Sequence, residues 1–263
     1  MTPVEVIRGD GPVVLGMPHT GTWLPEDIRA RLNSRGHALS DTDWHIDKLY
    51  KGLLPGATIV RATFHRYVID ANRSPEDESL YPGQNTTGLV PTTDFDGAPI
   101  WQTEPDKAEI AKRLSGYHRP YHAALSAELE RVRAKHGVAI LYDCHSIRSH
   151  IPFLFEGTLP DFNIGTAGGT TCDPRIEAVT LRNCQASGRT TVLNGRFKGG
   201  WTTRHYGRPQ EGIHAIQMEL AQSTHLASEV APYAYDPARA DTLSPILSDI
   251  LHSLADLAPD LRG

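Results

Sequence analysis

The sequence predicts a single α/β domain in which helices cover both faces of a mixed β-sheet, giving three layers in the order α/β/α. Short apolar runs typical of buried strands alternate along the chain with longer segments of helical periodicity. Strands that are apolar along their whole length are buried on both faces of a sheet. No linker, repeat or low-complexity block divides the 263 residues, so we expect one domain over residues 1–263.

The first strand is predicted at residues 13–17, where the apolar run VVLGM is followed by a turn over 18–22. A helix is then predicted from residue 25 to residue 34. Pro25 suits its first position, and two acids follow in its first turn.

The segment 40–54 carries apolar residues at helical spacing, and it predicts a second helix. Asp43 and Asp47 are four residues apart, so on such a helix they would share one face. The next strand is predicted at 57–63, with a continuation through 65–69.

The middle of the chain begins with an aperiodic stretch, 74–103, that is rich in turn residues. A loop of this length in a compact domain is usually functional. The longest helix is predicted at 105–136, with a bend near Gly116 and Pro120. It leads into 138–146, an apolar strand that ends in a polar cluster.

The last part of the chain repeats the alternation in shorter elements. Strands are predicted at 153–155, 162–164, 192–193 and 213–220, and helices at 174–186 and 237–257. Two glycine-rich loops, 165–171 and 195–209, separate these elements.

The composition, 39% hydrophobic and 22% charged, is ordinary for a globular protein, and no apolar run could span a bilayer. A net charge of −5 argues against nucleic-acid and anionic-membrane partners. The first residues lack the layout of a secretory signal. The three cysteines form no CxxC pair, which favours a reducing compartment. We therefore expect a cytoplasmic protein of unknown oligomeric state whose partner is a small molecule.

Two histidines stand where predicted strands end. His19 follows the first strand and His145 closes the strand at 138–146. Ligands bind beyond the carboxyl ends of strands in open α/β sheets, so these side chains could meet there. Two histidines and a carboxylate form the ligand set of a hydrolytic zinc site. Glu26 and Asp47 are both candidates for the acid. In the alternative, these polar residues only cap turns and helix starts.

Three further residues near the predicted strand ends have the chemistry of an active site. Glu219 could act as general base or be a surface acid. Asp143 could orient a ligand histidine or cap a turn. Cys144 could be the nucleophile of a cysteine amidase. However, strand neighbours point to opposite faces, so Cys144 and His145 would diverge, which favours a buried structural cysteine.

Several arginines are predicted to lie beside the same site in an otherwise acidic protein. They are Arg66, Arg73, Arg148 and Arg204. Guanidinium groups bind carboxylates through two parallel hydrogen bonds. Four of them together suggest an anionic small molecule with more than one carboxylate, although each alone could be a surface ion pair.

A series of motifs runs through nearly the whole chain in a specific order. They are PHTGT at 18–22, DTDWHID at 41–47, RYVIDANR at 66–73, SLYPGQ at 79–84, DCHSIR at 143–148, NGRFKGG at 194–200 and QMEL at 217–220. With these motifs the chain resembles the N-formylglutamate amidohydrolase (N-formylglutamate deformylase) family. The resemblance implies a phosphorylase/hydrolase-like (zinc-carboxypeptidase-like) fold. It also implies hydrolysis of N-formyl-L-glutamate to formate and L-glutamate in histidine degradation.

The resemblance also implies a set of site residues. Zn²⁺, or another divalent transition metal, would be held by His19, Asp47 and His145, with Glu26 as the reserve acid, and Glu219 would be the base. The Asn72–Arg73 pair resembles the carboxylate-binding pair of carboxypeptidases. We expect Arg66 to stabilise the oxyanion, and the substrate carboxylates to be bound by Asn72, Arg73, Arg148 and Arg204.

Three other functions remain open at this point. The first is a zinc hydrolase of another N-acyl or N-formimidoyl amino acid. The second is a metal-free amidase that depends on Cys144, and the third is a non-enzymatic carboxylate-binding protein that keeps the arginines.

Overall fold

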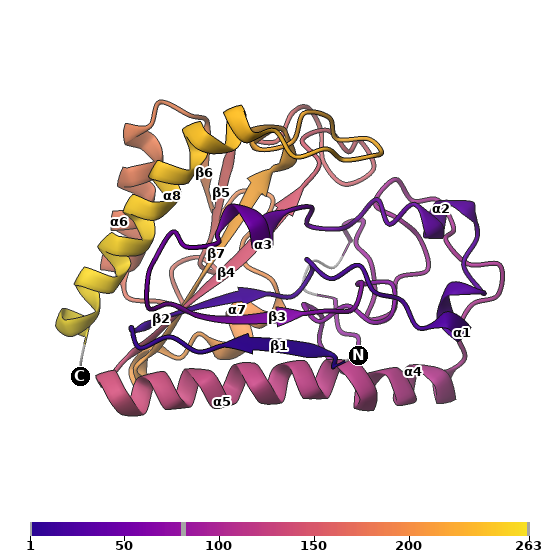
Figure 1. Cartoon of the computed structure of the whole chain (residues 1–263), viewed down its shortest axis with the longest axis horizontal. Helices are drawn as coiled ribbons and strands as arrows, with labels where there is room; N and C mark the ends of the chain where they lie inside the picture. Colours follow the sequence, from indigo (N-terminus) through magenta and orange to yellow (C-terminus); the bar gives the residue numbers. More distant parts are fainter. Residues whose placement is uncertain (1, 80–82, 262–263) are drawn as a thin grey trace.

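A mixed β-sheet forms the centre of the molecule (Figure 1). The computed structural model describes residues 2–79 and 83–261, so part of the SLYPGQ motif lies outside the described residues. Within these ranges, seven strands pair in the order β1-β3-β2-β4-β7-β5-β6. The strands are β1 (Val4–Ile7), β2 (Val13–Met17), β3 (Thr58–Ala62), β4 (Ala139–Ile147), β5 (Phe162–Gly165), β6 (Thr191–Leu193) and β7 (Ile213–Ala221).

The inner strands β3, β2, β4 and β7 are parallel, whereas β1 and β5 each pair antiparallel with a neighbour. All nine residues of β4 and of β7 are buried, as expected for central parallel strands covered on both faces. The prediction of a mixed sheet is confirmed.

Helices pack on both faces of this sheet, with α5 along one face and α6 and α8 along the other (Figure 1). The helices are α1 (Glu26–Arg29), α2 (Ser34–His37), α3 (Ile46–Leu49), α4 (Lys107–Arg113), α5 (Arg119–His136), α6 (Pro174–Ala186), α7 (Trp201–Tyr206) and α8 (Pro237–Leu257). Side chains of β4 alternate between the two layers. Ile140, Tyr142 and Cys144 join the core under α6 and α8, and Ala139 and Leu141 join the core under α5. The three-layer α/β/α architecture is therefore confirmed.

The longest predicted helix is present in three joined parts. A π-helical turn, Leu114–His118, connects α4 to α5, close to the predicted bend at Gly116 and Pro120. Gly137, with φ of 76°, ends α5 in the left-handed conformation that glycine adopts without steric cost.

Several predicted elements differ from the structure. The strand β1 and the helix α7 were not predicted, residues 65–69 and 153–155 form turns and loops instead of strands, and the helix predicted at 25–34 is only α1. In the 195–209 loop, α7 begins directly after the Gly199-Gly200 pair.

The helix predicted at 40–54 is reduced to the single turn α3. His45 precedes it with φ of 61°, a left-handed conformation that a continuous right-handed helix cannot contain. Asp43 therefore lies in a loop and Asp47 in α3, and the two acids do not share a helix face.

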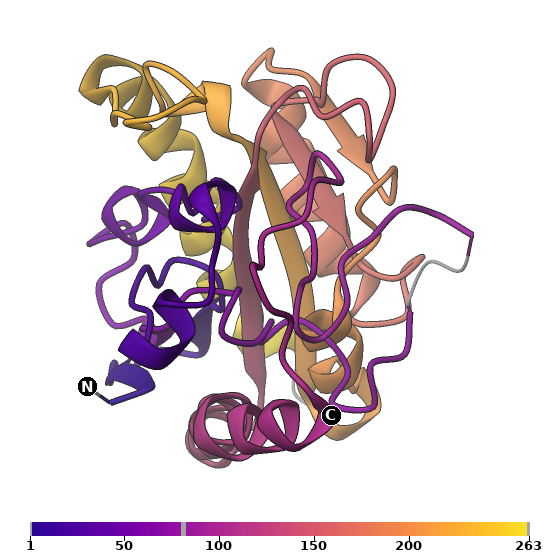
Figure 2. The same cartoon turned by 90° about the vertical axis from the view of Figure 1, so that its right-hand side faces the viewer.

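The parallel strands finish at one end of the sheet, and Figure 2 looks onto this end. Loops from the first half of the chain lie over it, including the purple segment that carries α1 and α2. Among the described residues, no helix combines the length and the apolar character that crossing a bilayer requires.

Candidate active site

His19 and His145 meet at the carboxyl ends of neighbouring strands, as predicted. His19 lies just beyond β2 and His145 lies near the end of β4, which pairs in parallel with β2. Their ring centroids are 5.0 Å apart, and both side chains are buried.

A separate carboxylate orients each imidazole. His19 Nε2 lies 2.7 Å from Asp70 Oδ1, and His145 Nε2 lies 3.1 Å from Asp143 Oδ1. Asp143 is itself held, because its Oδ2 accepts a hydrogen bond from the Thr203 hydroxyl at 2.8 Å. A carboxylate on the outer nitrogen fixes the ring and its tautomer in metal-binding histidines. Here it leaves Nδ1 as the inward-facing nitrogen of both rings.

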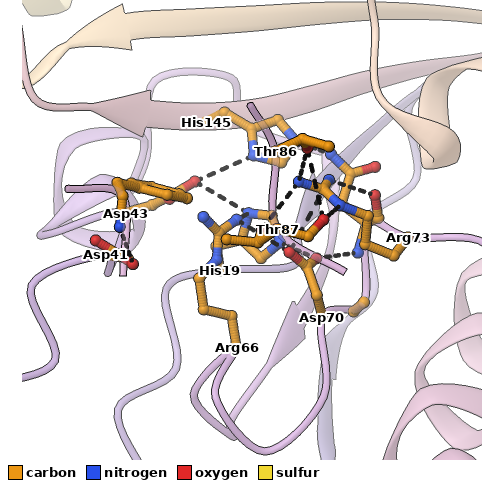
Figure 3. A network of polar contacts seen from close by, with 12 residues as sticks. His19, Asp41, Asp43, Arg66, Asp70, Arg73, Thr86, Thr87 and His145 are labelled. Carbon is orange, nitrogen blue, oxygen red and sulfur yellow. Dashed lines mark hydrogen bonds and ion pairs between the residues drawn. The ribbon is translucent and has the colours of Figure 1, made fainter. Parts of the chain in front are cut away.

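Asp43 completes the group from one side (Figure 3). Its Oδ2 lies 3.1 Å from His145 Nδ1 and 3.7 Å from His19 Nδ1. The Ser146 N–H donates to the same oxygen, and the Asp43 N–H donates to the His19 carbonyl. One ligand atom from each of His19, Asp43 and His145 falls within 4.8 Å of the others.

This donor group fits a divalent transition metal. Two imidazoles that face inward and one carboxylate are the usual donors of a three-ligand zinc site. Burial would raise the pKa of Asp43, but the adjacent His19 and His145 lower it below its ordinary value. Burial would lower the pKa of His145, but Asp143 and Asp43 raise it. The surrounding acids thus favour a positive charge at this position.

The acid in this group is not the one that was predicted. Asp47 forms an ion pair with Arg61 at 2.9 Å, and its side chain is 41% exposed. Glu26, the reserve acid, is exposed in the first turn of α1. The left-handed backbone at His45 turns the chain between the two aspartates and leaves only Asp43 beside the histidines.

Glu219 faces the same group from β7. It is the register partner of His145 on β4, and it lines a cavity together with His19, Asp43 and His145. Burial raises the pKa of the Glu219 carboxyl to about 8, and Asp43 contributes in the same direction. A buried carboxyl with a raised pKa in a cavity is characteristic of a general acid–base group.

Gln217 connects Glu219 to the loop before α7. Its Nε2 donates to Glu219 Oε2 at 3.4 Å, and its Oε1 accepts from the Gly200 N–H at 2.7 Å. Residues 217 and 219 are two apart on a strand, so they point to the same face. The two-residue spacing of Gln217 and Glu219 in the QMEL motif already indicated a shared face, but no role for Gln217 was predicted.

Arg66 lies against the donor group in the cavity (Figure 3). Its guanidinium contacts His19 Nδ1, lies 3.8 Å from Asp70 Oδ2 and stacks over the Phe95 ring. It therefore brings positive charge to the place where the buried acids favour a cation.

Asn72 also lines the cavity, between the donor group and α7. Its Oδ1 accepts from the Thr202 N–H at 2.9 Å, and its Nδ2 lies 3.3 Å from His145 Nε2. Two buried histidines of the helical layer hold the backbone on either side of it. His118 contacts the carbonyl of Arg73, and His122 contacts the carbonyl of Ala71.

Arg73 faces the cavity from the side opposite Asp43 (Figure 3). Its guanidinium donates to the Thr87 carbonyl at 2.8 Å, to the Asn72 carbonyl at 3.1 Å and to the hydroxyls of Thr86 and Thr87. These contacts fix Arg73 firmly and use most of its five donors.

The other two predicted arginines lie elsewhere. Arg148 donates to Asp96 at 3.0 Å, and Arg204 donates through Nε to the Gly199 carbonyl at 2.9 Å. Among the described residues that line the cavity, neither is present. Of the four predicted arginines, the structure thus brings Arg66 and Arg73 to one cavity and places Arg148 and Arg204 outside its described lining.

Cys144 lies on the opposite face of the sheet from His145. It belongs to the core under α6 and α8, is fully buried, and burial raises the pKa of its thiol well above the usual value. A cysteine amidase needs an accessible thiolate. The structure therefore supports the hypothesis that Cys144 is a buried core residue.

The Asn72 side chain packs directly against Gly200, at the place where any other residue would carry its Cβ. A Cβ at position 200 would lie 2.3 Å from Asn72 Nδ2. We expect Gly200→Ala to displace Asn72 and to lower turnover by roughly 10²-fold, because small misplacements at a reacting site have effects of this size. Gly116→Ala, where a Cβ meets nothing within 4 Å, is the matched control. Steady-state kinetics on both variants checks this, and unchanged kcat/KM in Gly200→Ala would contradict it.

Known proteins share this architecture. A crystal structure of N-formylglutamate amidohydrolase from Ralstonia eutropha JMP134 superposes with a TM-score of 0.84 at 27% identity, covering 99% of each chain. A gene product from Agrobacterium tumefaciens shares the fold, with a TM-score of 0.68 at 21% identity over 97% of this chain and 96% of that one.

Sequence comparison is more specific. Curated proteins named N-formylglutamate deformylase from Pseudomonas aeruginosa and Pseudomonas putida are each 45% identical to this chain over 251 residues. The match covers 94% of this chain, 94% of the first relative and 93% of the second. The model of the family described as N-formylglutamate amidohydrolase matches residues 11–226. The chain therefore belongs to the N-formylglutamate amidohydrolase family.

Proposed function

We propose that this protein is a metal-dependent amidohydrolase that cleaves N-formyl-L-glutamate to formate and L-glutamate. The observation that carries the proposal is the His19–Asp43–His145 donor group, which faces Glu219 in one cavity. The names of the relatives at 45% identity support the substrate. The corresponding setting is histidine degradation in the cytoplasm.

The metal site consists of His19 Nδ1, His145 Nδ1 and an Asp43 oxygen. Zn²⁺ suits this set of donors, and another divalent transition metal is compatible with them. When bound, the ion supplies a Lewis acid that polarises the formyl carbonyl and makes water more acidic. Asp70, which is hydrogen-bonded to His19 Nε2, and Asp143, which lies 3.1 Å from His145 Nε2, would orient the two rings so that Nδ1 faces the ion.

Glu219 is the proposed general base. It takes a proton from the water that attacks the formyl carbon and delivers that proton to the departing amide nitrogen. Burial, which raises the pKa of the Glu219 carboxyl, suits the second transfer, because it strengthens the hold of the carboxyl on the proton until the nitrogen departs. Gln217 directs the carboxylate through the hydrogen bond from its Nε2.

Two further groups bind the parts of the substrate that carry or develop negative charge. Arg66 provides a buried positive charge for the oxyanion that forms at the formyl oxygen. Asn72 and Arg73 line the cavity beside the donor group, where the Asn72 amide and the charge and remaining donor of Arg73 would bind the α-carboxylate next to the scissile amide.

Metal analysis combined with formate release tests this proposal. We expect the purified protein to contain about one transition-metal ion per chain, as one three-ligand site requires. Chelation should abolish formate release from N-formyl-L-glutamate, and added Zn²⁺ should restore it. Full activity of metal-free protein would contradict the metal dependence. Faster hydrolysis of an N-acetyl or N-formimidoyl amino acid would contradict the substrate.

A further inference from the structure

The rim of the cavity carries an arginine for which the proposed mechanism has no role. We use "rim" for the lining residues Asn85, Thr86, Leu154, Arg196 and Phe197. They come from the long 74–103 loop, from the turns after β4 and from the NGRFKGG motif. Arg196 is the charged member of this set, and it belongs to a motif whose function the sequence did not explain.

Backbone carbonyls of two other rim residues hold the Arg196 guanidinium. Its Nε donates to the Leu154 carbonyl at 2.9 Å, and a terminal nitrogen donates to the Asn85 carbonyl at 3.0 Å. The group also lies over the Phe197 ring, 5.3 Å from its centroid. These contacts orient the guanidinium, and the two carbonyl acceptors carry no formal charge.

The other cavity arginines have different surroundings. Arg66 is buried against His19, and Arg73 gives most of its donors to the Asn72–Thr87 region. Both lie close to the donor group (Figure 3). Arg196 instead joins the turn after β4 to the 74–103 loop through its contacts with Leu154 and Asn85.

The chemistry of N-formylglutamate requires two separate anion sites. Its α-carboxylate is attached to the carbon that bears the scissile nitrogen, so its partner must lie beside the donor group. The side-chain carboxylate is two methylene groups further away. The rim lines the same cavity as Glu219 and the donor group, so it is the part left for the side-chain carboxylate once Asn72 and Arg73 bind the α-carboxylate.

We propose that Arg196 binds the side-chain carboxylate of the substrate and selects for an acidic side chain. This inference rests on the proposed function. A site that is built to bind a charged group discriminates against a neutral analogue, because its own polar groups are then left without a partner. Arg196 is thus a specificity-determining residue, separate from the groups that act on the formyl carbon.

The test compares kcat/KM for N-formyl-L-glutamate with kcat/KM for N-formyl-L-glutamine, which has a similar shape and no side-chain charge. We expect the wild type to prefer N-formyl-L-glutamate and Arg196→Gln to lose roughly 10–10²-fold of that preference. The loss should come from a lower kcat/KM for N-formyl-L-glutamate, with kcat/KM for N-formyl-L-glutamine unchanged. Arg196→Lys keeps the charge and should retain part of the preference. Arg189→Gln, an arginine that contacts Thr242 outside the cavity, is the matched control and should behave as wild type.

Each other outcome has a definite meaning. Equal loss on both substrates would show that Arg196 only anchors the rim backbone, and an unchanged preference would show that it does not contact the substrate; either overturns the inference. If the wild type releases no formate from either compound, the proposed function fails. The same preference is then measured as the ratio of the two dissociation constants by calorimetry, so the role of Arg196 is tested independently.

Discussion

Replacing Glu219 with glutamine is expected to reduce formate release roughly 10²–10⁴-fold, the usual contribution of a general base. Glutamine has nearly the same shape, so the cavity and the contact with Gln217 should persist. Its amide, however, cannot take a proton from the attacking water. The measurement is kcat on N-formyl-L-glutamate together with the metal content of the variant.

Metal content distinguishes a lost base from a damaged site. Because Glu219 is outside the donor group, Glu219→Gln should bind as much Zn²⁺ as the wild type. Glu104→Gln, at an exposed position outside the cavity lining, is the matched control and should keep full activity. Turnover of Glu219→Gln at the wild-type level would exclude Glu219 as the base.

Asp43→Asn is expected to weaken metal binding by more than about 10²-fold, since even the outer partners of metal ligands contribute up to that amount. The amide removes the one negative charge of the proposed ligand set. Asp47→Asn is its natural counterpart, because Asp47 pairs with Arg61 and should leave metal binding unchanged. Competition with a zinc-binding dye measures both affinities.

The pair of variants decides between the two acids directly. The resemblance pointed to Asp47, whereas the geometry points to Asp43. If Asp47→Asn loses the metal and Asp43→Asn keeps it, the site described here is incorrect.

The sequence predicted that His19, His145 and Glu219 lie near one end of the sheet, because the positions of these residues depend on strands. His19 follows, and His145 lies near the end of, an apolar run typical of a buried strand, and parallel neighbours bring such ends together. Glu219 closes a third such run. The order of strands brought these residues to one cavity, and the alternation of faces correctly separated Cys144 from His145.

The acid could not be predicted in this way because it lies in a loop. The apolar spacing of 40–54 indicated a helix, yet the left-handed conformation of His45 interrupts it. A positive φ at a residue other than glycine leaves little signal in sequence. The interruption is held by tertiary contacts, among them that of His45 Nε2 with the Tyr233 carbonyl.

The positions of the arginines were also hard to predict, because they depend on loops that leave no periodic pattern in the sequence. Arg148 comes directly after β4, but the partner that draws it away, Asp96, belongs to the aperiodic 74–103 loop. Arg204 lies on α7, a short helix within a segment that reads as a glycine-rich loop. Arg196 was visible only as part of a motif, because its contacts come from two distant segments.

The register that pairs His145 with Glu219 has a consequence for how this architecture diversifies. The proposed ligand His145 and the proposed base Glu219 are directly paired residues of neighbouring strands, which constrains their separation and their relative orientation. The rim, in contrast, is assembled from independent turns outside these paired strands. Exchange of rim segments between homologues should therefore alter which side chain is accepted while the hydrolytic apparatus is inherited intact. On the proposed assignments, substrate selectivity depends on loops that can be exchanged, whereas hydrolysis depends on residues that the strand pairing holds in place.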